Sequence, residues 1–482
     1  MKSGRITLKN IGTHDSVPIC VICGSTCKKD EFYWDEMTRT IVVEDVMCKD
    51  CCKDYEYDSE EDCYRRRQDP AILWKHNTPL HACVIETLKP FNEILRADTN
   101  HIYFICGLYE LQEGTNMRSG SIVIYRYSRC ATSNKDLCFV ITTINCSSGV
   151  LDMKISDNLL FVALSEGSLC SYKLEAKKGE GLCDDIFLSL EYVKSHSIAD
   201  EGMFLSLSVV KTDSATHRVF ISTQAGSAIV CDYSLNDKIN VGASAVEMAT
   251  IVLVAHIEKM HVFLGESTAA WIIFADSKNP SRFATGGLYL PFFIVLYCFS
   301  IAYIALHLTG DDCTLRLWDI DHSIEKNVYA SKKGDFKAGV TSGQFQPSSD
   351  KFVVGSYDEN ISIYRGFGAN CVRLVKIEAG GGIWRTKWFT KSYDEDYVVS
   401  ANMFGGASIF SLTKTGSEKE NKDIVYDFDR VYTFKDCNTE TSLAYGVDVL
   451  HHEAHEGKND VLVMAICTFY DNKVIIVRSD FP

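Results

Sequence analysis

The chain has 482 residues, which is too long for one ordinary domain and long enough for a large all-β ring with an extra module. Its residues are 46% hydrophobic and 23% charged, a normal globular balance that excludes general disorder. The net charge of −15 disfavours a nucleic-acid backbone as the main partner and leaves room for a basic protein partner. Residues 1–12 hold no apolar core of signal-peptide length, so we do not expect a secreted protein.

Residues 1–75 differ in composition from the rest, with seven of the 20 cysteines before residue 64 and a charged linker after them. Two Cys-x-x-Cys pairs, 24 residues apart, supply the four thiolates of a tetrahedral zinc site. The predicted ligands are Cys20, Cys23, Cys48 and Cys51. Between residues 20 and 64, 13 acidic residues outnumber five basic ones, which is wrong for binding a phosphate backbone. We therefore expect a small module with a structural zinc; unpaired free cysteines are the alternative.

From about residue 80 the sequence changes to short apolar runs with period-2 alternation, bounded by Gly, Asn, Asp and Ser. This pattern predicts strands joined by hairpin turns. The runs resemble one another at a spacing of roughly 40–60 residues, the length of a four-stranded propeller blade. A single blade cannot bury both of its faces, so such units close into a ring. Seven units are expected, at about 80–128, 135–174, 200–234, 246–320, 328–366, 372–412 and 426–478.

An apolar stretch interrupts the fourth unit. Residues 288–308 carry no Asp, Glu, Lys or Arg and have the length of a transmembrane helix. When residues 288–310 are removed, the flanking residues align with residues 352–364 position for position, so the stretch divides a hairpin. A spanning helix cannot leave and return at one turn, because its ends lie about 30 Å apart. We therefore expect no membrane segment and interpret residues 288–310 as a translated retained intron; a genuine apolar insertion on the propeller is the alternative.

Segments typical of WD repeats follow this stretch. Residues 314–319 read TLRLWD, a WD-type blade ending, and residues 345–348 with 354–358 read FQPS and VGSYD, a WD-type blade middle. The sequence thus predicts an all-β fold, a seven-bladed WD-repeat β-propeller over residues 80–478, with the small Cys-rich module before it. Asp358, the last residue of VGSYD, is either a turn aspartate bonded to its own backbone or a functional side chain.

The motifs of the propeller region resemble one known family. In chain order they are CGLYELQ at 106–112, GGGIWRTKW at 380–388, SANMFGG at 400–406, YGVD at 445–448 and CTFYD at 467–471. This order resembles the diphthine methyl ester hydrolases, the WD-repeat proteins of diphthamide biosynthesis, over about residues 80–478. Residues 1–75 and the apolar stretch near 288–308 depart from the family pattern.

The resemblance implies an enzyme that hydrolyses a methyl ester. The implied substrate is diphthine methyl ester, the modified histidine of translation elongation factor 2, and loss of the methyl group frees a carboxylate for the final amidation to diphthamide. Elongation factor 2 would then be the partner. No nucleic acid, no membrane and no cofactor of the hydrolase are expected.

Ester hydrolysis requires a water, a base and donors for the oxyanion, and the quaternary ammonium of this substrate favours an aromatic face. In WD propellers the start of each innermost strand and the turn before each blade's third strand reach the same rim of the ring. On this basis Asp448 or Asp471 is the expected base, and Arg385 is expected to bind the oxyanion or the product carboxylate. The expected substrate-binding residues are Trp384, Tyr470, Tyr357 and Asp358, with Trp384 or Tyr470 facing the cation. Blade packing and turn capping are the alternative roles for each residue.

Standard hydrolase motifs are missing from the sequence. It has no Gly-x-Ser-x-Gly elbow, no P-loop and no complete Gly-x-Gly-x-x-Gly, and HHEAH at 451–455 misses the zinc-protease spacing. Without the resemblance, the chain would be interpreted as a non-catalytic WD-repeat adaptor, which remains the alternative. The cysteines beyond residue 75 are scattered singly in apolar runs, as in proteins of a reducing compartment, so a cytoplasmic protein is expected.

Overall fold

The computed structural model divides the chain into two compact units, Met1–Ala71 and Ile72–Pro482. The structure describes residues 33–35, 40–42, 55–58, 63–66, 71–89, 101–128, 137–178, 186–197, 201–241, 244–263, 266–287, 312–320, 326–390, 395–415, 425–435, 442–453 and 460–481. In the first unit these residues form two hairpins, β1 (Tyr33–Asp35) with β2 (Thr40–Val42) and β3 (Tyr55–Asp58) with β4 (Cys63–Arg66). The four cysteines predicted to bind zinc lie outside the described residues.

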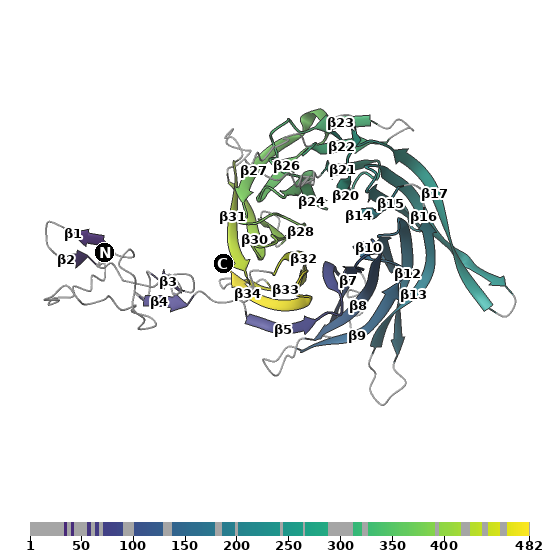
Figure 1. Cartoon of the computed structure of the whole chain (residues 1–482), viewed down its shortest axis with the longest axis horizontal. Coiled ribbons are helices and arrows are strands. Elements are labelled where there is room, and N and C mark those ends of the chain that lie inside the picture. The colour runs from purple at the N-terminus through teal and green to yellow at the C-terminus, as the bar shows by residue number, and fades with distance from the viewer. Residues whose placement is uncertain are drawn as a thin grey trace, which may run out of the picture. The chain divides into compact units, whose positions relative to one another are not determined.

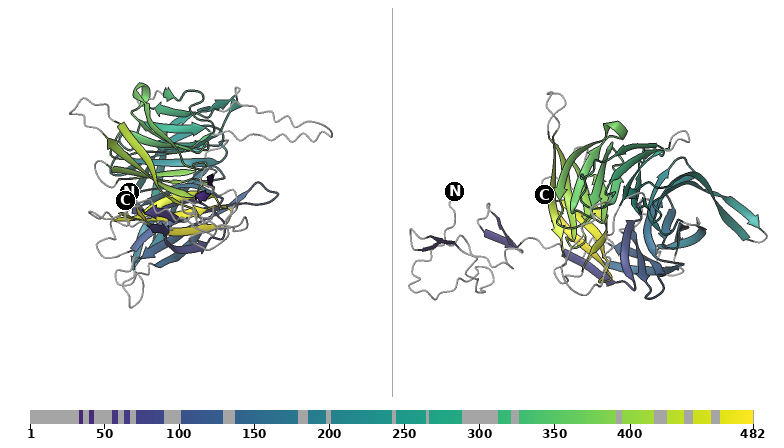
Figure 2. Two further views of the ribbon diagram at one scale, coloured as in Figure 1. Left: turned by 90° about the vertical axis from the view of Figure 1, so that its left-hand side faces the viewer. Right: turned by 45° about the horizontal axis from the view of Figure 1, so that its top comes forward.

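The second unit is a seven-bladed β-propeller, as the sequence predicts (Figure 1). Each blade is a four-stranded sheet, and in the first six blades the strands follow chain order from the innermost to the outermost. The first three blades are β6 (His81–Thr87), β7 (His101–Leu111), β8 (Arg118–Ser128) and β9 (Leu137–Cys146); β10 (Val150–Ser156), β11 (Leu159–Leu164), β12 (Ser168–Lys178) and β13 (Ile186–Ser197); and β14 (Phe204–Lys211), β15 (Thr216–Thr223), β16 (Ala228–Val241) and β17 (Ser244–Ile257). The hairpin of β16 and β17 extends beyond the rest of the ring (Figure 2).

The other four blades complete the ring. They are β20 (Ala270–Ala275), β21 (Arg282–Gly287), β22 (Leu315–Asp319) and β23 (Lys326–Ala330); β24 (Val340–Phe345), β25 (Lys351–Ser356), β26 (Asn360–Arg365) and β27 (Val372–Glu378); β28 (Arg385–Thr390), β29 (Glu395–Ala401), β30 (Ala407–Thr415) and β31 (Val425–Phe434); and β32 (Ala444–Glu453), β33 (Asp460–Thr468), β34 (Lys473–Phe481) and β5 (Ala71–Asn77). A short hairpin of β18 (Val262–Phe263) and β19 (Glu266–Ser267) precedes blade 4, and a 3-10 helix (Gly368–Asn370) precedes β27.

The ring closes by exchange of one strand. β5 precedes blade 1 in the sequence but forms the outermost strand of blade 7, next to β34 (Figure 1). Directly after β5, the N–H of Thr78 donates to the carbonyl of Asn472 at 2.7 Å, and His81 Nδ1 donates to the carbonyl of Phe469 at 3.0 Å. Backbone pairing therefore holds the first and last blades together.

Hydrophobic cores lie between neighbouring blades. One core joins blades 1 and 7, with Phe104 and Tyr125 packed among residues such as Val463 and Ile476. Because successive side chains of a strand point to opposite faces, a strand between two such cores is apolar throughout. β11, with the sequence LLFVAL, is buried at every position.

The outermost strands explain why the sequence units and the blades have different limits. β9, with the sequence LCFVITTINC, is largely exposed although it is apolar, and it was assigned to the second unit although it completes blade 1. The same shift recurs around the ring, and the number of seven blades is confirmed.

A hydrogen-bonded set of side chains joins His261, which precedes blade 4, to the second and third strands of that blade. His261 Nδ1 lies 3.0 Å from Asp312 Oδ2, and His261 Nε2 lies 2.9 Å from the hydroxyl of Thr285. The indole N–H of Trp318 donates to the same hydroxyl at 2.9 Å. Trp318 is the Trp of the TLRLWD motif, so the motif marks a complete WD-type blade.

The residues on either side of the apolar stretch form one regular hairpin. β21 and β22 pair in the same register as β25 and β26. The opposed pairs are Gly286–Leu315 and Phe283–Trp318 in blade 4, and Gly355–Ile361 and Phe352–Tyr364 in blade 5. Cys313 and Glu359, which lie two residues before Leu315 and Ile361, both have positive φ angles, of 24° and 68°. Residues 288–310 themselves lie outside the described residues.

Candidate active site

A pocket opens at one mouth of the central channel, where the innermost strands begin; we call it the channel-mouth pocket. In six blades the register of the innermost strand slips by one residue against the second strand, which leaves one residue bulged. The bulged residues are Cys83, Leu151, Leu205, Trp271, Thr341 and Tyr445. In blade 6, Trp384 takes this position, because its N–H donates to the carbonyl of Ala401, the pairing partner of Arg385. The pocket is lined by the bulged residues other than Tyr445, and by Trp384, Arg385, Tyr109, Arg118 and Met203.

Aromatic side chains from four blades border this pocket. The ring of Trp384 lies 5.8 Å from that of Trp271 and 4.7 Å from that of Tyr445, measured between centroids. Tyr445 stacks on Phe469 at 4.5 Å, and Phe469 lies 5.1 Å from Tyr109. Aromatic faces attract quaternary ammonium groups, so this border has the chemistry that the predicted cation contact of Trp384 would need.

Arg385 lies between the pocket and the rest of the channel. Its Nη1 donates to the carbonyl of Trp384 at 3.1 Å, and its Nη2 donates to the carbonyl of Leu151 at 3.4 Å. The Nε of Arg385 and the indole Nε1 of Trp384 are both buried and make no hydrogen bond. A buried donor without an acceptor costs about 1–3 kcal/mol, so an oxygen of a bound ligand would be stabilised here.

A second pocket, which we call the rim pocket, adjoins the first and shares Tyr109 and Arg118 with it. Its lining also includes His81, Glu110, Leu111, Gln112, Glu113, Ser119, Phe469 and Tyr470. The ring of Tyr470 is 59% exposed and meets Phe469 edge-on at 5.0 Å. This pocket therefore combines carboxylates with aromatic rings.

The channel beyond Arg385 contains a compact ionic network. Lys154 Nζ donates to Glu86 at 2.5 Å, and Lys387 Nζ donates to the other oxygen of Glu86 at 2.6 Å. Lys387 Nζ also lies 3.7 Å from Asp448. Burial alone would lower the pKa of Lys387, but Asp448 and Glu86 outweigh burial and raise it. The network is therefore a set of paired charges that links the innermost strands of blades 1, 2, 6 and 7.

Asp448 lies deeper than the sequence indicated. It was expected at the start of an innermost strand, but β32 begins at Ala444 and Asp448 lies within it. In blade 6, Gly382 lies two residues before Trp384, whereas in blade 7 Gly446 follows the bulged Tyr445, so aligning the two blades on these glycines misplaces blade 7 by three residues. Asp448 Oδ2 accepts a hydrogen bond from the N–H of Thr87, and Oδ1 accepts one from its neighbour Val449, both at 2.8 Å.

The electrostatic surroundings of Asp448 agree with a structural role. Burial alone would raise its pKa, but Lys387, Lys89 and the two backbone N–H groups outweigh burial and lower it. Both of its oxygens accept backbone hydrogen bonds and its side chain is buried, so a water has little access to either oxygen. The geometry therefore favours a structural role for Asp448, which joins blade 7 to blade 1, over the role of base expected from the sequence.

Asp471, the other expected base, lies in the turn between β33 and β34 on the same rim as Tyr470. Lys473 Nζ donates to its Oδ2 at 3.0 Å. Burial alone would raise the pKa of Asp471, but the hydroxyl of Thr468, the ammonium of Lys473 and the hydroxyl of Ser442 outweigh burial and lower it. Asp471 is therefore an ionised carboxylate at the rim.

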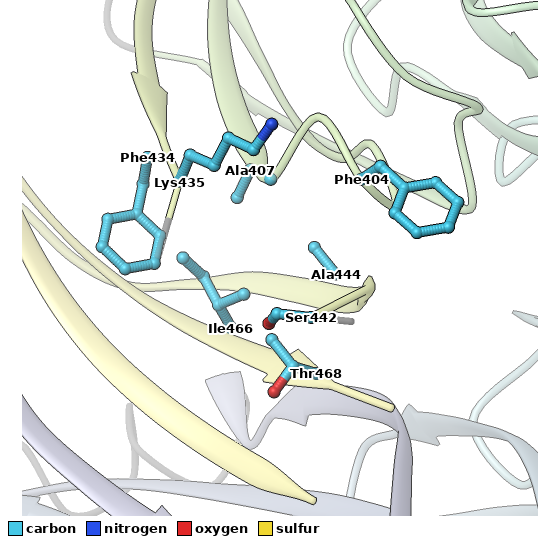
Figure 3. Close-up of a pocket in the computed structure, with 9 residues that line it drawn as sticks. Phe404, Ala407, Phe434, Lys435, Ser442, Ala444, Ile466 and Thr468 are labelled. Atoms are coloured by element: carbon cyan, nitrogen blue, oxygen red, sulfur yellow. The ribbon is translucent and has the colours of Figure 1, made fainter. Parts of the chain in front are cut away.

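A small pocket lies between blades 6 and 7 (Figure 3). It is lined by Phe404, Gly406, Ala407, Phe434, Lys435, Ser442, Ala444, Ile466 and Thr468. Ser442 and Thr468 are the hydroxyls that stabilise the Asp471 carboxylate, so this pocket lies directly next to the expected base.

Tyr357 and Asp358, the remaining expected residues, lie in the turn between β25 and β26. Asp358 Oδ1 accepts a hydrogen bond from the N–H of Asn360 at 3.2 Å, and Oδ2 accepts one from the N–H of Lys337 at 2.8 Å. These bonds are those of a turn aspartate, the alternative role considered from the sequence. Tyr357 is 44% exposed, and neither residue lines the channel-mouth pocket.

Other chemistry at this mouth is limited. Burial raises the pKa of the Cys83 thiol to about 12, which makes it a poor nucleophile. Among the described residues, no group of three or more His, Cys, Asp or Glu side chains is placed to hold a metal ion.

The residues that the structure describes include no helix with the length and apolar character needed to cross a membrane.

Comparison with known proteins gives one match by sequence. No protein-family model matches the chain. Over 400 residues it is 25% identical to a Dictyostelium discoideum protein named "Diphthine methyltransferase homolog", a match that covers 77% of this chain and 92% of that protein. Among solved structures, a chain in the crystal structure of the mitotic checkpoint complex has a TM-score of 0.48 and 13% identity, covering 86% of this chain and 97% of that chain. Over most of its length, this chain is thus similar to a protein whose name refers to diphthine.

Proposed function

We propose that this protein acts in diphthamide biosynthesis and hydrolyses the methyl ester of diphthine methyl ester on translation elongation factor 2. The observation that carries the proposal is the pair of unbonded N–H donors, on Arg385 and Trp384, in a pocket with aromatic walls. An ester carbonyl needs such donors as it becomes an oxyanion, and a quaternary ammonium needs aromatic faces. The similarity to a diphthine-named protein supports this choice of substrate.

In the proposed reaction a water attacks the carbonyl carbon of the ester and gives a proton to a base. The carbonyl oxygen becomes an oxyanion that accepts hydrogen bonds from Arg385 Nε and Trp384 Nε1. The intermediate then collapses, the bond to the methoxy group breaks, and the methoxy group leaves as methanol after it takes up a proton. The product is a carboxylate, and water is the only co-reactant.

Asp471 is the base that we propose. It is ionised, lies on the rim and adjoins Tyr470, which lines the rim pocket. Asp448 is given a positioning role instead, because both of its oxygens accept backbone hydrogen bonds and Lys387 lies beside it.

The test is methanol release from elongation factor 2 that carries diphthine methyl ester, without added cofactor. Hydrolysis yields methanol and a free carboxylate on the modified histidine, both measurable by mass spectrometry. The name of the similar protein refers to methyl transfer, so a second reaction contains diphthine and S-adenosylmethionine. If diphthine takes up a methyl group in this reaction and the ester releases no methanol in the first, the protein is a methyltransferase and not a hydrolase. If the protein binds the elongation factor and changes neither substrate, the adaptor alternative holds.

Two variants connect the activity to the pocket. Removing one oxyanion donor typically lowers the rate by about 100- to 1,000-fold, so Arg385→Ala should be folded and slow. Trp384→Phe keeps the ring and removes the N–H, and it should slow the reaction with little change in folding. Normal turnover in both variants would refute this site.

A further inference from the structure

The two adjoining pockets at the channel mouth suit opposite charges. The channel-mouth pocket contains the unbonded N–H donors of Arg385 and Trp384. The rim pocket contains the carboxylates of Glu110 and Glu113 with several aromatic rings. Tyr109 and Arg118 line both pockets, so the two pockets lie side by side.

The channel-mouth pocket suits a carboxylate. Each oxygen would give one buried donor its missing acceptor, and a bond to the guanidinium is charge-assisted. Asp152 neutralises Arg385 only in part, because its Oδ1 lies 3.9 Å from Nη2 of Arg385. The Oδ2 of Asp152 accepts hydrogen bonds from the hydroxyl of Ser206 and the N–H of Leu207, both at 2.9 Å. Asp152 therefore faces Nη2 and leaves the buried Nε without an acceptor.

In the rim pocket the carboxylates of Glu110 and Glu113 outnumber the guanidinium of Arg118, and with the aromatic rings they suit a cation that has no hydrogen-bond donor. Tyr109, Phe469 and Tyr470 present aromatic rings, which attract a trimethylammonium group through their faces. The carboxylates of Glu110 and Glu113 add attraction over a longer range.

We infer that the two pockets form one site for betaine-type zwitterions, small molecules that carry a trimethylammonium group and a carboxylate. The inference rests on the proposed function for its biological meaning, because the product of that reaction carries both charges and the ester carries only the cation. The site therefore holds the product group more tightly than the ester, and free betaines compete with the protein substrate.

The test measures binding of trimethylglycine to the full-length protein by calorimetry. Three comparison ligands each remove one feature: trimethylglycine methyl ester lacks the anionic charge, tetramethylammonium lacks the carboxylate entirely, and tert-butylacetate lacks the cation. We expect trimethylglycine to bind at least roughly tenfold more tightly than each of them, since it alone makes both charged contacts.

Variants separate the two ends of the ligand. Trp384→Phe should weaken trimethylglycine binding by roughly fivefold to tenfold, as expected for loss of one hydrogen bond, and leave tetramethylammonium binding unchanged. Tyr470→Leu should weaken both. Tyr192→Leu is the matched control, because Tyr192 is similarly exposed, 58% against 59%, and lies on the outermost strand of blade 2.

The outcomes distinguish this inference from the proposed reaction. Equal affinity for trimethylglycine and its methyl ester, or unchanged trimethylglycine affinity in Trp384→Phe, overturns the inference. Tight trimethylglycine binding without methanol release supports the zwitterion site and refutes hydrolysis. Methanol release without trimethylglycine binding refutes the zwitterion site alone.

Discussion

Asp448 joins the last blade to the first: its Oδ2 accepts a hydrogen bond of 2.8 Å from the backbone N–H of Thr87, 361 positions away in the sequence. Asp152 makes the same kind of contact between blades 2 and 3, where its Oδ2 accepts from the N–H of Leu207 at 2.9 Å. Both carboxylates are buried and both border the ionic network of the channel. The residues that surround the channel thus hold the ring together as well as lining it.

Replacing Asp448 with Asn keeps the shape of the side chain and removes the charge beside Lys387. We expect Asp448→Asn to lower the free energy of unfolding by about 2–4 kcal/mol, because it leaves a buried cation with less compensation. Urea denaturation measures this change. Asp157→Asn is the control: the Asp157–Lys211 pair is largely exposed, and its loss should change the free energy of unfolding by less than about 1 kcal/mol. An equally small change in Asp448→Asn would contradict the anchor role.

The same carboxylate makes the stability depend on pH. The pKa of Asp448 is lowered in the folded state, so its contribution is present above the unfolded value of about 3.9 and is lost as pH falls through the folded value. The difference in unfolding free energy between the wild type and Asp448→Asn should therefore be complete at neutral pH and shrink below about pH 4. Denaturation at several pH values measures it. A difference that stays constant would show that Asp448 is not an ionised anchor.

Asp471→Asn tests the proposed base. We expect methanol release to fall by about 100-fold or more, as is typical when a general base is lost. The melting temperature should change little, because Asp471 lies in a turn and forms its ion pair with the nearby Lys473. Asp213→Asn is the control, since Asp213 is also a turn aspartate, bonded to the N–H groups of Ala215 and Thr216 at 2.8 Å. Full activity in Asp471→Asn would require another base.

The blades could be predicted from the sequence because strands buried on both faces, such as β11, give apolar runs at a regular spacing. The aromatic border of the channel-mouth pocket could not be predicted from the sequence. Trp271 and Tyr445 reach it because the innermost strand bulges against its neighbour, and this register depends on pairing between strands rather than on local pattern. Once the blades are aligned on the bulged residue, Trp271 and Tyr445 take the position that Trp384 occupies in blade 6.

Deleting residues 288–310 should leave the propeller intact. β21 and β22 already pair in the register of an ordinary hairpin, so a short turn can join Gly287 to Asp311 without altering the ladder. We expect the deletion variant to show a higher soluble yield, because a 21-residue uncharged stretch is removed, with equal or higher methanol release. Sequencing the transcript is the companion measurement: a message that always encodes residues 288–310 ends the intron interpretation.

Residues 1–75 are proposed to bind one zinc ion and to be dispensable for hydrolysis. Metal analysis of the full-length protein should find about one zinc per chain, given four thiolates in a tetrahedral site. The variant Cys20→Ser/Cys48→Ser should lose this zinc and keep its rate of methanol release. Unchanged metal content in the variant would exclude these ligands, and a loss of activity would show that the module takes part in the reaction.

The place of β5 in the last blade has a consequence for biosynthesis. While the ribosome makes the first six blades, β5 has no partner, because β34 has not yet been synthesised. The nascent chain is therefore an open arc with unpaired strand edges, which are prone to pair with other chains. Pairing between such distant segments also slows folding. A chaperone that shields β5 during translation would thus control how much of the newly made protein reaches the closed ring.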